Sequence, residues 1–449
     1  MFRKIWFILF IVVVALSCFL PVNVCAETSP PDITAESAVV MDVETGQVVY
    51  SKNMTEKAYP ASITKIMTAL LAVEKGNMSD ILTATESAVG NEAVPRDTTH
   101  IMLVDGEQMP LESLLYATML PSANDAANVV AEYIGGSLSG FADMMNERAK
   151  EIGCVNTNFT NANGLPDDNH YVCAYDMALI TKTALQNELF RKFFSAVIYT
   201  AEPTNKNTER SGATSHKMMK NGEFYYEGVT GGKTGWTKPA KYTCVTSARR
   251  NDTELICVLL GCETGDARFS ETIDLFNYVF DNFRYVTLSK TVAGPYSANV
   301  VKDDYKISVA EYSLDGDITF LLENSYAQSD IKITASVPAE YTADPGPEHI
   351  TLVVDGKEIA TYPLELSLST LDETVFVGTG EVSSSGSGGF WNMVVKILVI
   401  IGIIILVLAV LFIIIVVYMR LERKKRVERR RRLKQRQQQN SFYFDDKNT

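Results

Sequence analysis

The chain has few histidines and cysteines, the residues that most often bind transition metals. It has four histidines and seven cysteines among 449 residues, with no C-x-x-C pair and no histidine cluster. We therefore expect no metal site, and nothing in the sequence calls for a cofactor. Removal of an N-terminal signal would leave five cysteines, too few and too unevenly spaced for a disulfide framework. Cys244 and Cys257 could face each other across a hairpin, but buried free thiols are the favoured state.

Positive charge is scarce between the two ends of the chain. The whole chain carries −13, whereas the segment from Arg420 onward carries +8, residues 1–26 carry +2 and Lys396 carries +1. The region in between therefore carries about −24. A surface this acidic argues against nucleic acid as the partner of this region. We interpret the basic tail as a topology determinant attracted to anionic lipid, with binding of a cytoplasmic partner or nucleic acid as the alternative.

Apolar segments near both ends predict where the protein resides. Residues 1–26 begin with two basic residues, continue as an apolar run and close with Val24-Cys25-Ala26, the pattern of a signal peptide cleaved after Ala26. An uncleaved anchor is the alternative. Residues 394–419 contain one charge and are long enough to cross a hydrocarbon core of ~30 Å as a transmembrane helix. Because the basic tail, 420–449, follows directly, we expect a single-pass cell-membrane protein with residues 27 to about 393 extracellular and a cytoplasmic C-terminus.

The extracellular part is expected to contain two domains. In 27–283, two β-rich runs within 37–50 predict a hairpin, and 241–262 predicts two more strands. Helical periodicity lies between them, in 62–74, 111–120, 123–134 and 141–152. This order predicts an α+β fold, an antiparallel sheet with packed helices and an all-helical insert. Short β-rich runs in 284–378 predict a small all-β domain, a β-sandwich, and 379–393 is a Ser/Gly linker.

Three short motifs carry the candidate chemistry. They are, in chain order, Ser62-Ile63-Thr64-Lys65, Ser122-Ala123-Asn124 and Lys233-Thr234-Gly235. Each motif alone is common, but all three in this order are improbable by chance. Together they would supply a nucleophile, a nearby amine and a binder for an anionic substrate.

The first motif indicates a nucleophile with its base. A serine hydroxyl is a weak nucleophile until a base removes its proton. Lys65 shares a helix face with Ser62 and could be that base if burial and the charge of Lys233 lower its pKa. Taken singly, Ser62 would be a helix cap and Lys65 a solvated helix residue.

The other two motifs indicate binding and proton transfer. Ser122 could relay a proton, or it could merely cap the next helix. The Asn124 amide suits the substrate backbone, and Lys233 with the Thr234 hydroxyl suits a carboxylate. At Gly235 a side chain would block the groove, so its absence leaves room for an extended peptide against the strand.

These motifs closely resemble those of the low-molecular-mass penicillin-binding proteins, the serine-type D-alanyl-D-alanine carboxypeptidases of peptidoglycan metabolism. The likeness covers roughly 35–285, with matching segments at 60–69, 122–127, 161–176 and 228–237. It implies a β-lactamase/transpeptidase-like fold, and the following β-domain fits the family's second domain by position. Two residues depart from the family pattern. Cys173 stands where Ser or Thr is usual, and Lys241 replaces a small residue.

The resemblance implies the reaction and the roles. Ser62 attacks the carbonyl between two D-alanines, Lys65 takes its proton, and an acyl-enzyme forms and is hydrolysed. The backbone N–H groups of Ser62 and Trp236 form the oxyanion hole, and pre-placed donors of this kind contribute ~10²–10³-fold. Trp236 thus joins Lys233, Thr234 and Gly235 in substrate binding. The expected partners are peptidoglycan stem peptides and, as covalent inhibitors, β-lactams, consistent with a hydrolase of cell-wall organisation and cell shape.

Two other functions remain open at this point. One is a related serine hydrolase, a DD-endopeptidase or a β-lactamase. A class A β-lactamase needs a deacylating glutamate in an E-x-x-L-N string, and the glutamates between Asn124 and Lys233 lack that context. The other is a non-catalytic β-lactam-binding scaffold, which the intact motifs argue against.

Overall fold

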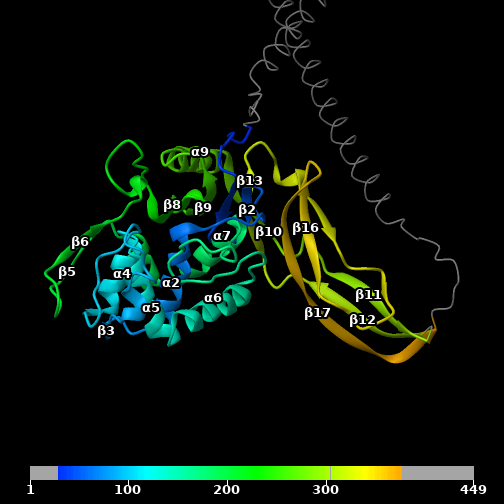
Figure 1. The fold of residues 1–449 in the computed structure, drawn as a ribbon. Coiled ribbons are helices and arrows are strands. Elements are labelled where there is room, and N and C mark those ends of the chain that lie inside the picture. Colours follow the sequence, from blue (N-terminus) through cyan, green and yellow to red (C-terminus); the bar gives the residue numbers. More distant parts are fainter. Residues whose placement is uncertain (1–28, 304, 377–449) are drawn as a thin grey trace, which may run out of the picture. The chain divides into compact units, whose positions relative to one another are not determined.

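A computed structural model describes residues 29–303 and 305–376 (Figure 1). The expected signal peptide, linker, transmembrane segment and basic tail lie outside these residues. Within the described ranges, no helix has the length and apolar character needed to span a membrane.

The first domain is built on a five-stranded antiparallel sheet in the order β2-β1-β9-β8-β7. The predicted N-terminal hairpin and the two later strands are confirmed as parts of this sheet. Among the described strands, β7 pairs with β8 alone and is an edge strand. The strands are β1 (Ser37–Asp42), β2 (Val48–Lys52), β7 (Val229–Thr237), β8 (Lys241–Arg250) and β9 (Thr253–Cys262).

Helices cover both faces of this sheet (Figure 1). Alternate residues of β1 and β9 enter two separate apolar clusters, as strand geometry requires. One cluster contains the helical insert, and the other contains α9 (Ala267–Asn282). The insert comprises α2 (Lys65–Lys75), α3 (Glu86–Val89), α4 (Leu111–Met119), α5 (Asn124–Gly135), α6 (Leu138–Ile152), α7 (Ala174–Ala184) and α8 (Glu188–Phe194). It is not all-helical as predicted, because it also contains two short antiparallel strand pairs, β3 (Ile81–Thr83) with β4 (Gln108–Pro110) and β5 (Ile198–Ala201) with β6 (Arg210–Ala213).

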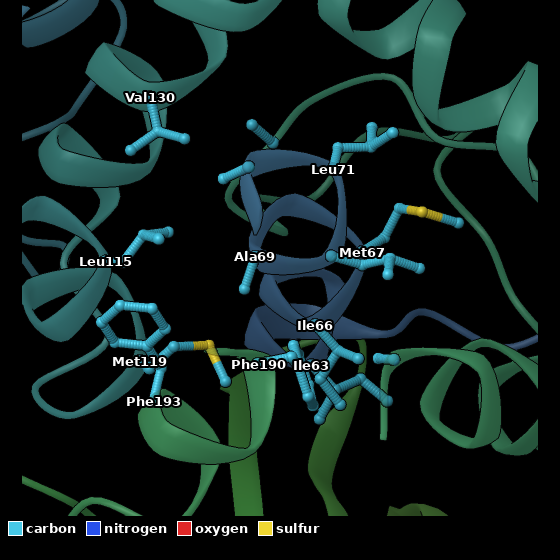
Figure 2. Packing of buried hydrophobic residues seen from close by; sticks show 14 of the residues in the cluster. Ile63, Ile66, Met67, Ala69, Leu71, Leu115, Met119, Val130, Phe190 and Phe193 are labelled. Atoms are coloured by element: carbon cyan, nitrogen blue, oxygen red, sulfur yellow. The ribbon is translucent and has the colours of Figure 1, made fainter. Parts of the chain in front are cut away.

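Helix α2 lies at the centre of the insert and is buried from Lys65 to Val73. Figure 2 shows apolar side chains of α4, α5 and α8 on one side of α2 and below it, while Met67 and Leu71 extend from the other side of α2. A helix that is apolar on all sides is a core helix. The residues at its N-terminal end are therefore held by close packing rather than by a mobile loop.

The second domain consists of β-strands. β10 (Phe283–Leu288) pairs with β13 (Ile318–Glu323), and a six-stranded sheet has the order β14-β16-β17-β12-β11-β15. The six strands are β11 (Tyr296–Lys302), β12 (Tyr305–Ser313), β14 (Lys332–Ala335), β15 (Glu340–Tyr341), β16 (Glu348–Val354) and β17 (Lys357–Phe376). Both sheets contribute to a third apolar cluster, so the domain has its own core.

The five cysteines of the described residues are free thiols. The idea that Cys244 and Cys257 face each other is wrong. The register of β8 and β9 places Cys244 opposite Leu259 and Cys257 opposite Thr246. Each cysteine is therefore two residues away from the position opposite the other.

Candidate active site

The fold brings the three sequence motifs together at the N-terminal end of α2. Ser62 lies in η1 (Ala61–Thr64), a single 3-10 turn, and Lys65 is the first residue of α2. Ser122 lies between α4 and α5, and Asn124 is the first residue of α5. Hydrogen bonds link the first motif to the second through Lys65 and the second to the third through Lys233.

The nucleophile turn differs from the regular helix start that the sequence predicts. Ala61 adopts φ +51°, a left-handed conformation that strains any residue with a side chain. The Thr243 hydroxyl donates to the Pro60 carbonyl at 2.9 Å and fixes the turn from the sheet side. On the other side, a Cβ at Gly164 would lie 1.9 Å from the Ala61 carbonyl oxygen. The turn is thus clamped between β8 and the Gly164 loop.

Lys65 is completely buried and makes three hydrogen bonds. Its Nζ donates to Ser62 Oγ at 3.0 Å, to Asn124 Oδ1 at 2.7 Å and to the Asn163 carbonyl at 2.5 Å. Burial, followed by the charge of Lys233, holds the pKa of Lys65 well below its usual range. In its neutral form the amine keeps two N–H donors, and its lone pair can accept the proton of the Ser62 hydroxyl that it contacts.

Lys233 is the second buried amine. Its Nζ donates to Ser122 Oγ at 2.9 Å and to the Thr234 carbonyl at 3.0 Å. Burial, and then the positive charge of Arg268, lowers the pKa of Lys233 to about 7. An anionic group close by would favour its charged form again.

Ser122 is not a helix cap. Residue Ala123 occupies the N-cap position of α5 without a side-chain hydrogen bond, and Ser122 itself has φ +67°. Strain of this kind on a nearly buried residue persists only where the surroundings enforce it, and such residues cluster at functional sites. Here it directs the hydroxyl to Lys233.

Gly235 is required for a reason beyond an open groove. A Cβ there would lie 2.4 Å from Thr243 Oγ1 and 2.8 Å from the backbone nitrogen of Ser62. The nucleophile turn therefore packs directly on β7, and only glycine permits this approach. The neighbouring Thr234 hydroxyl bonds Ser215 Oγ at 2.6 Å, while Trp236 is 58% exposed.

Sequence reasoning did not assign a role to Asn163 and His170, although both lie in a segment that resembles the family. Asn163 supplies the third acceptor for Lys65, and its amide donates to Asn128 Oδ1 at 2.9 Å. His170 Nδ1 accepts from the Thr160 backbone N–H at 3.0 Å, so its Nε2 carries the proton toward Thr64 Oγ1 at 2.9 Å. Burial lowers the pKa of His170 to about 4, and a neutral ring suits this bridge.

Two further cationic or titratable groups lie beside β7. Arg268 of α9 donates to the Gly235 carbonyl at 3.1 Å. His216 packs under Gly232, where a Cβ would lie 2.4 Å from its ring, and burial lowers its pKa to about 3. No local sequence motif marks either residue, because the fold alone brings them to the strand.

Cys173 replaces the usual hydroxyl without loss of the local hydrogen bond. It is the N-cap of α7, and its Sγ accepts from the Asp176 backbone N–H at 3.4 Å. Across residues 29–303 and 305–376, no group of three or more histidine, cysteine, aspartate or glutamate side chains is arranged to hold a metal ion.

Comparison with known proteins agrees with this geometry. Residues 24–264 match the family model described as D-alanyl-D-alanine carboxypeptidase, peptidase family S11. The chain is 32% identical over 335 residues to D-alanyl-D-alanine carboxypeptidase DacF of Bacillus subtilis, covering 74% of this chain and 84% of the relative. It is 29% identical over 378 residues to DacC of Escherichia coli, covering 80% and 90%.

Solved structures show the same fold. Penicillin-binding protein 5 of Haemophilus influenzae superposes with a TM-score of 0.60 at 27% identity, covering 76% of this chain and 98% of that one. The Streptomyces K15 DD-transpeptidase gives a TM-score of 0.53 at 27% identity, covering 57% and 100%. The predicted transpeptidase-like fold is confirmed, and the chain belongs to the D-alanyl-D-alanine carboxypeptidase family, S11.

Proposed function

We propose that the protein removes the terminal D-alanine from peptidoglycan stem peptides through an acyl-enzyme on Ser62. The observation that carries the proposal is the buried contact of Lys65 Nζ with Ser62 Oγ at 3.0 Å. A neutral amine within hydrogen-bond distance of a hydroxyl is the arrangement that activates a serine nucleophile.

Acylation follows from these contacts. Lys65 accepts the Ser62 proton as Oγ attacks the carbonyl carbon of the penultimate D-alanine. The C–N bond then breaks, and the departing amine takes up the proton that Lys65 accepted, with Ser122 as the proposed relay. Water attacks the ester as Lys65 accepts one of its protons, the acyl C–O bond to Ser62 breaks, Lys65 returns the proton to Oγ, and the shortened peptide leaves. The Asn124 amide and the Asn163 carbonyl keep the lysine in place throughout.

Recognition is assigned to β7. The substrate carboxylate lies against Lys233 and the Thr234 hydroxyl, with Arg268 adding positive charge nearby. The backbone N–H groups of Ser62 and Trp236 receive the developing oxyanion, and the absence of a side chain at Gly235 lets these two segments approach. β-Lactams, which mimic acyl-D-alanyl-D-alanine, would acylate the same serine.

The reaction is tested with the full-length protein in detergent and an acyl-L-lysyl-D-alanyl-D-alanine peptide. We expect release of one D-alanine per peptide, and a penicillin adduct on Ser62 that survives denaturation and is mapped by mass spectrometry. Ser62→Ala should lose both. Labelling or D-alanine release that persists in this variant would refute the assignment.

The location of the enzyme is part of the proposal. Residues 27–283 would form the extracellular catalytic domain and 284–378 the β-domain. Residues 394–419 would be the anchor, and the basic segment 420–449 would lie in the cytoplasm. The apolar character of 394–419 and the basic residues that follow support this orientation.

The anchor is tested by truncation. A protein ending at Ser383 should appear in the soluble fraction with unchanged turnover of soluble peptides, because a Ser/Gly linker transmits little geometry. Membrane association of this shortened protein, or loss of turnover by a folded one, would reject the passive tether.

A further inference from the structure

A polar groove lies on the helical insert, at the end of α5 remote from Ser62. Its volume of about 620 Å³ is in the range of sites that bind small ligands. Residues of β3, of the short helix α3 and of the C-terminal half of α5 line it, and Figure 1 shows β3 and α5 at one edge of the first domain. None of these residues takes part in the proposed reaction, so the groove needs another explanation.

Two carboxylates in the groove are surrounded by hydroxyl groups. Glu132 Oε1 accepts from Ser87 Oγ at 2.6 Å, and its Oε2 accepts from the Thr85 hydroxyl. Asp80 Oδ2 accepts from the Tyr133 hydroxyl at 2.6 Å. A carboxylate has about four acceptor sites, so both carboxylates keep sites for further donors. The groove can therefore accept hydrogen bonds from a ligand that carries hydroxyl groups.

The same groove also offers apolar surface. Tyr133 is 39% exposed and Ile81 is 59% exposed, and both line the groove. The hydrogen bond to Asp80 holds the Tyr133 ring by its polar end. An aromatic ring held in this way presents an apolar face beside polar groups, and it can cover the C–H groups of a ligand.

This combination favours a sugar over a cation. In the part of the chain that the structure describes, no group of three or more acidic, histidine or cysteine side chains is arranged to hold a metal ion. Both carboxylates already accept from neutral hydroxyl groups rather than from basic side chains. A sugar ring carries hydroxyl donors at its edge for Glu132 and Asp80, and C–H groups on its faces for Tyr133.

We propose that this groove binds the glycan chain of the cell wall, a polymer of N-acetylated amino sugars. The choice of glycan rests on the proposed function, because stem peptides are attached to such chains. Asn124, which contacts the catalytic lysine, and Tyr133 are about 14 Å apart along the axis of α5. An extended pentapeptide stem spans at most about 17 Å. A glycan held in the groove would therefore keep stem peptides within reach of Ser62.

The test titrates chitotetraose, a soluble tetramer of β-1,4-linked N-acetylglucosamine, into the full-length protein by calorimetry, in a detergent without a sugar headgroup. We expect saturable binding with a Kd of about 1 mM or below. Tyr133→Ala should weaken binding by at least about fivefold, because the aromatic contact is lost. Glu132→Gln should weaken it by a similar factor, because a charged acceptor is lost. Tyr133→Phe keeps the ring and should retain most of the affinity.

Tyr225→Ala is the matched control, because Tyr225 is 52% exposed and lies outside the groove. It should bind chitotetraose as the wild type does, and every variant should release D-alanine from a soluble stem peptide at the wild-type rate. Absence of saturable chitotetraose binding, or unchanged affinity in Tyr133→Ala, would overturn the inference while D-alanine release continued.

Two further outcomes separate this inference from its alternatives. Tighter binding of tetralysine than of chitotetraose, lost in Glu132→Gln and kept in Tyr133→Ala, would assign the groove to a cationic peptide and overturn the saccharide site. Chitotetraose binding that depends on Tyr133, in a protein that releases no D-alanine, would reject the proposed function and still support the saccharide site.

Discussion

Gly164 controls the position of the nucleophile turn, and Gly164→Ala should show this directly. Gly164 has φ +87°, and a Cβ added to it would lie 1.9 Å from the Ala61 carbonyl oxygen and 3.0 Å from the Ser62 nitrogen. Carbon and oxygen atoms that are not bonded keep at least about 3.0 Å apart. The turn would therefore have to retreat by about 1.1 Å, the difference between the two distances. A displacement of this size at a reacting group costs about 10²-fold in rate.

The variant also carries a backbone penalty, which a second glycine isolates. A left-handed conformation costs a residue with a Cβ roughly 1–2 kcal/mol. Gly153 has φ +95°, and a Cβ added there would meet no atom of the described residues within 4 Å, so Gly153→Ala carries the same penalty without a clash. Both variants should unfold at lower temperature, and only Gly164→Ala should be acylated slowly by penicillin. The rate is measured by mass spectrometry per folded molecule. Wild-type acylation in a folded Gly164→Ala protein would refute the reasoning.

Three further results are expected. Lys65→Arg keeps the charge but cannot release its proton at working pH, so penicillin acylation should fall by about 10²–10⁴-fold; near-normal acylation would remove Lys65 from its role. Because the pKa of Lys233 is about 7, the free enzyme loses this charge as the pH rises, and kcat/KM for a carboxylate peptide should decline above pH 7. Lys233→Arg should move that decline upward, and a flat wild-type profile to pH 9 would contradict the carboxylate assignment. The folded-state pKa of His170, about 4, is below its ordinary 6.5, so the unfolded chain binds a proton first as the pH falls. The free energy of unfolding should decrease by up to about 3 kcal/mol between pH 6.5 and 4, and by less in His170→Gln, as urea titrations at several pH values would show.

The sequence was sufficient to predict the secondary-structure elements whose residue pattern is local. The hairpin of β1 and β2, the helices of the insert and the strands β8 and β9 each carry their apolar residues in a pattern contained within the segment itself. Ser62, Lys65, Ser122 and Lys233 could be selected because chemistry limits which side chains suit each role. These four residues meet in one site only because of the fold. The same motifs predict that fold through the family resemblance.

Other features depend on backbone atoms and on contacts distant in sequence. The third acceptor for Lys65 is the Asn163 carbonyl, a group that every residue carries, so no residue type reveals it. The helix-cap alternative for Ser122 failed because Ala123 occupies the N-cap position, and the Ser122 hydroxyl accepts instead from Lys233, 111 residues away. The sequence predicted that the missing side chain at Gly235 leaves space for substrate. In the structure, a Cβ added there would instead lie nearest to Thr243 and to the backbone of the nucleophile Ser62.

The open edge of β7 has a consequence for which chains the protein can accept. An unpaired strand edge would accept almost any extended backbone, including that of another copy of the protein. Lys233 limits this, because a strand laid across it without a negative charge would leave its buried amine without a counter-ion and force it to lose its proton. A chain end brings its own carboxylate, and the interior of a chain does not. One inward-pointing lysine could thus make the same edge attractive to peptide termini and unattractive to self-association.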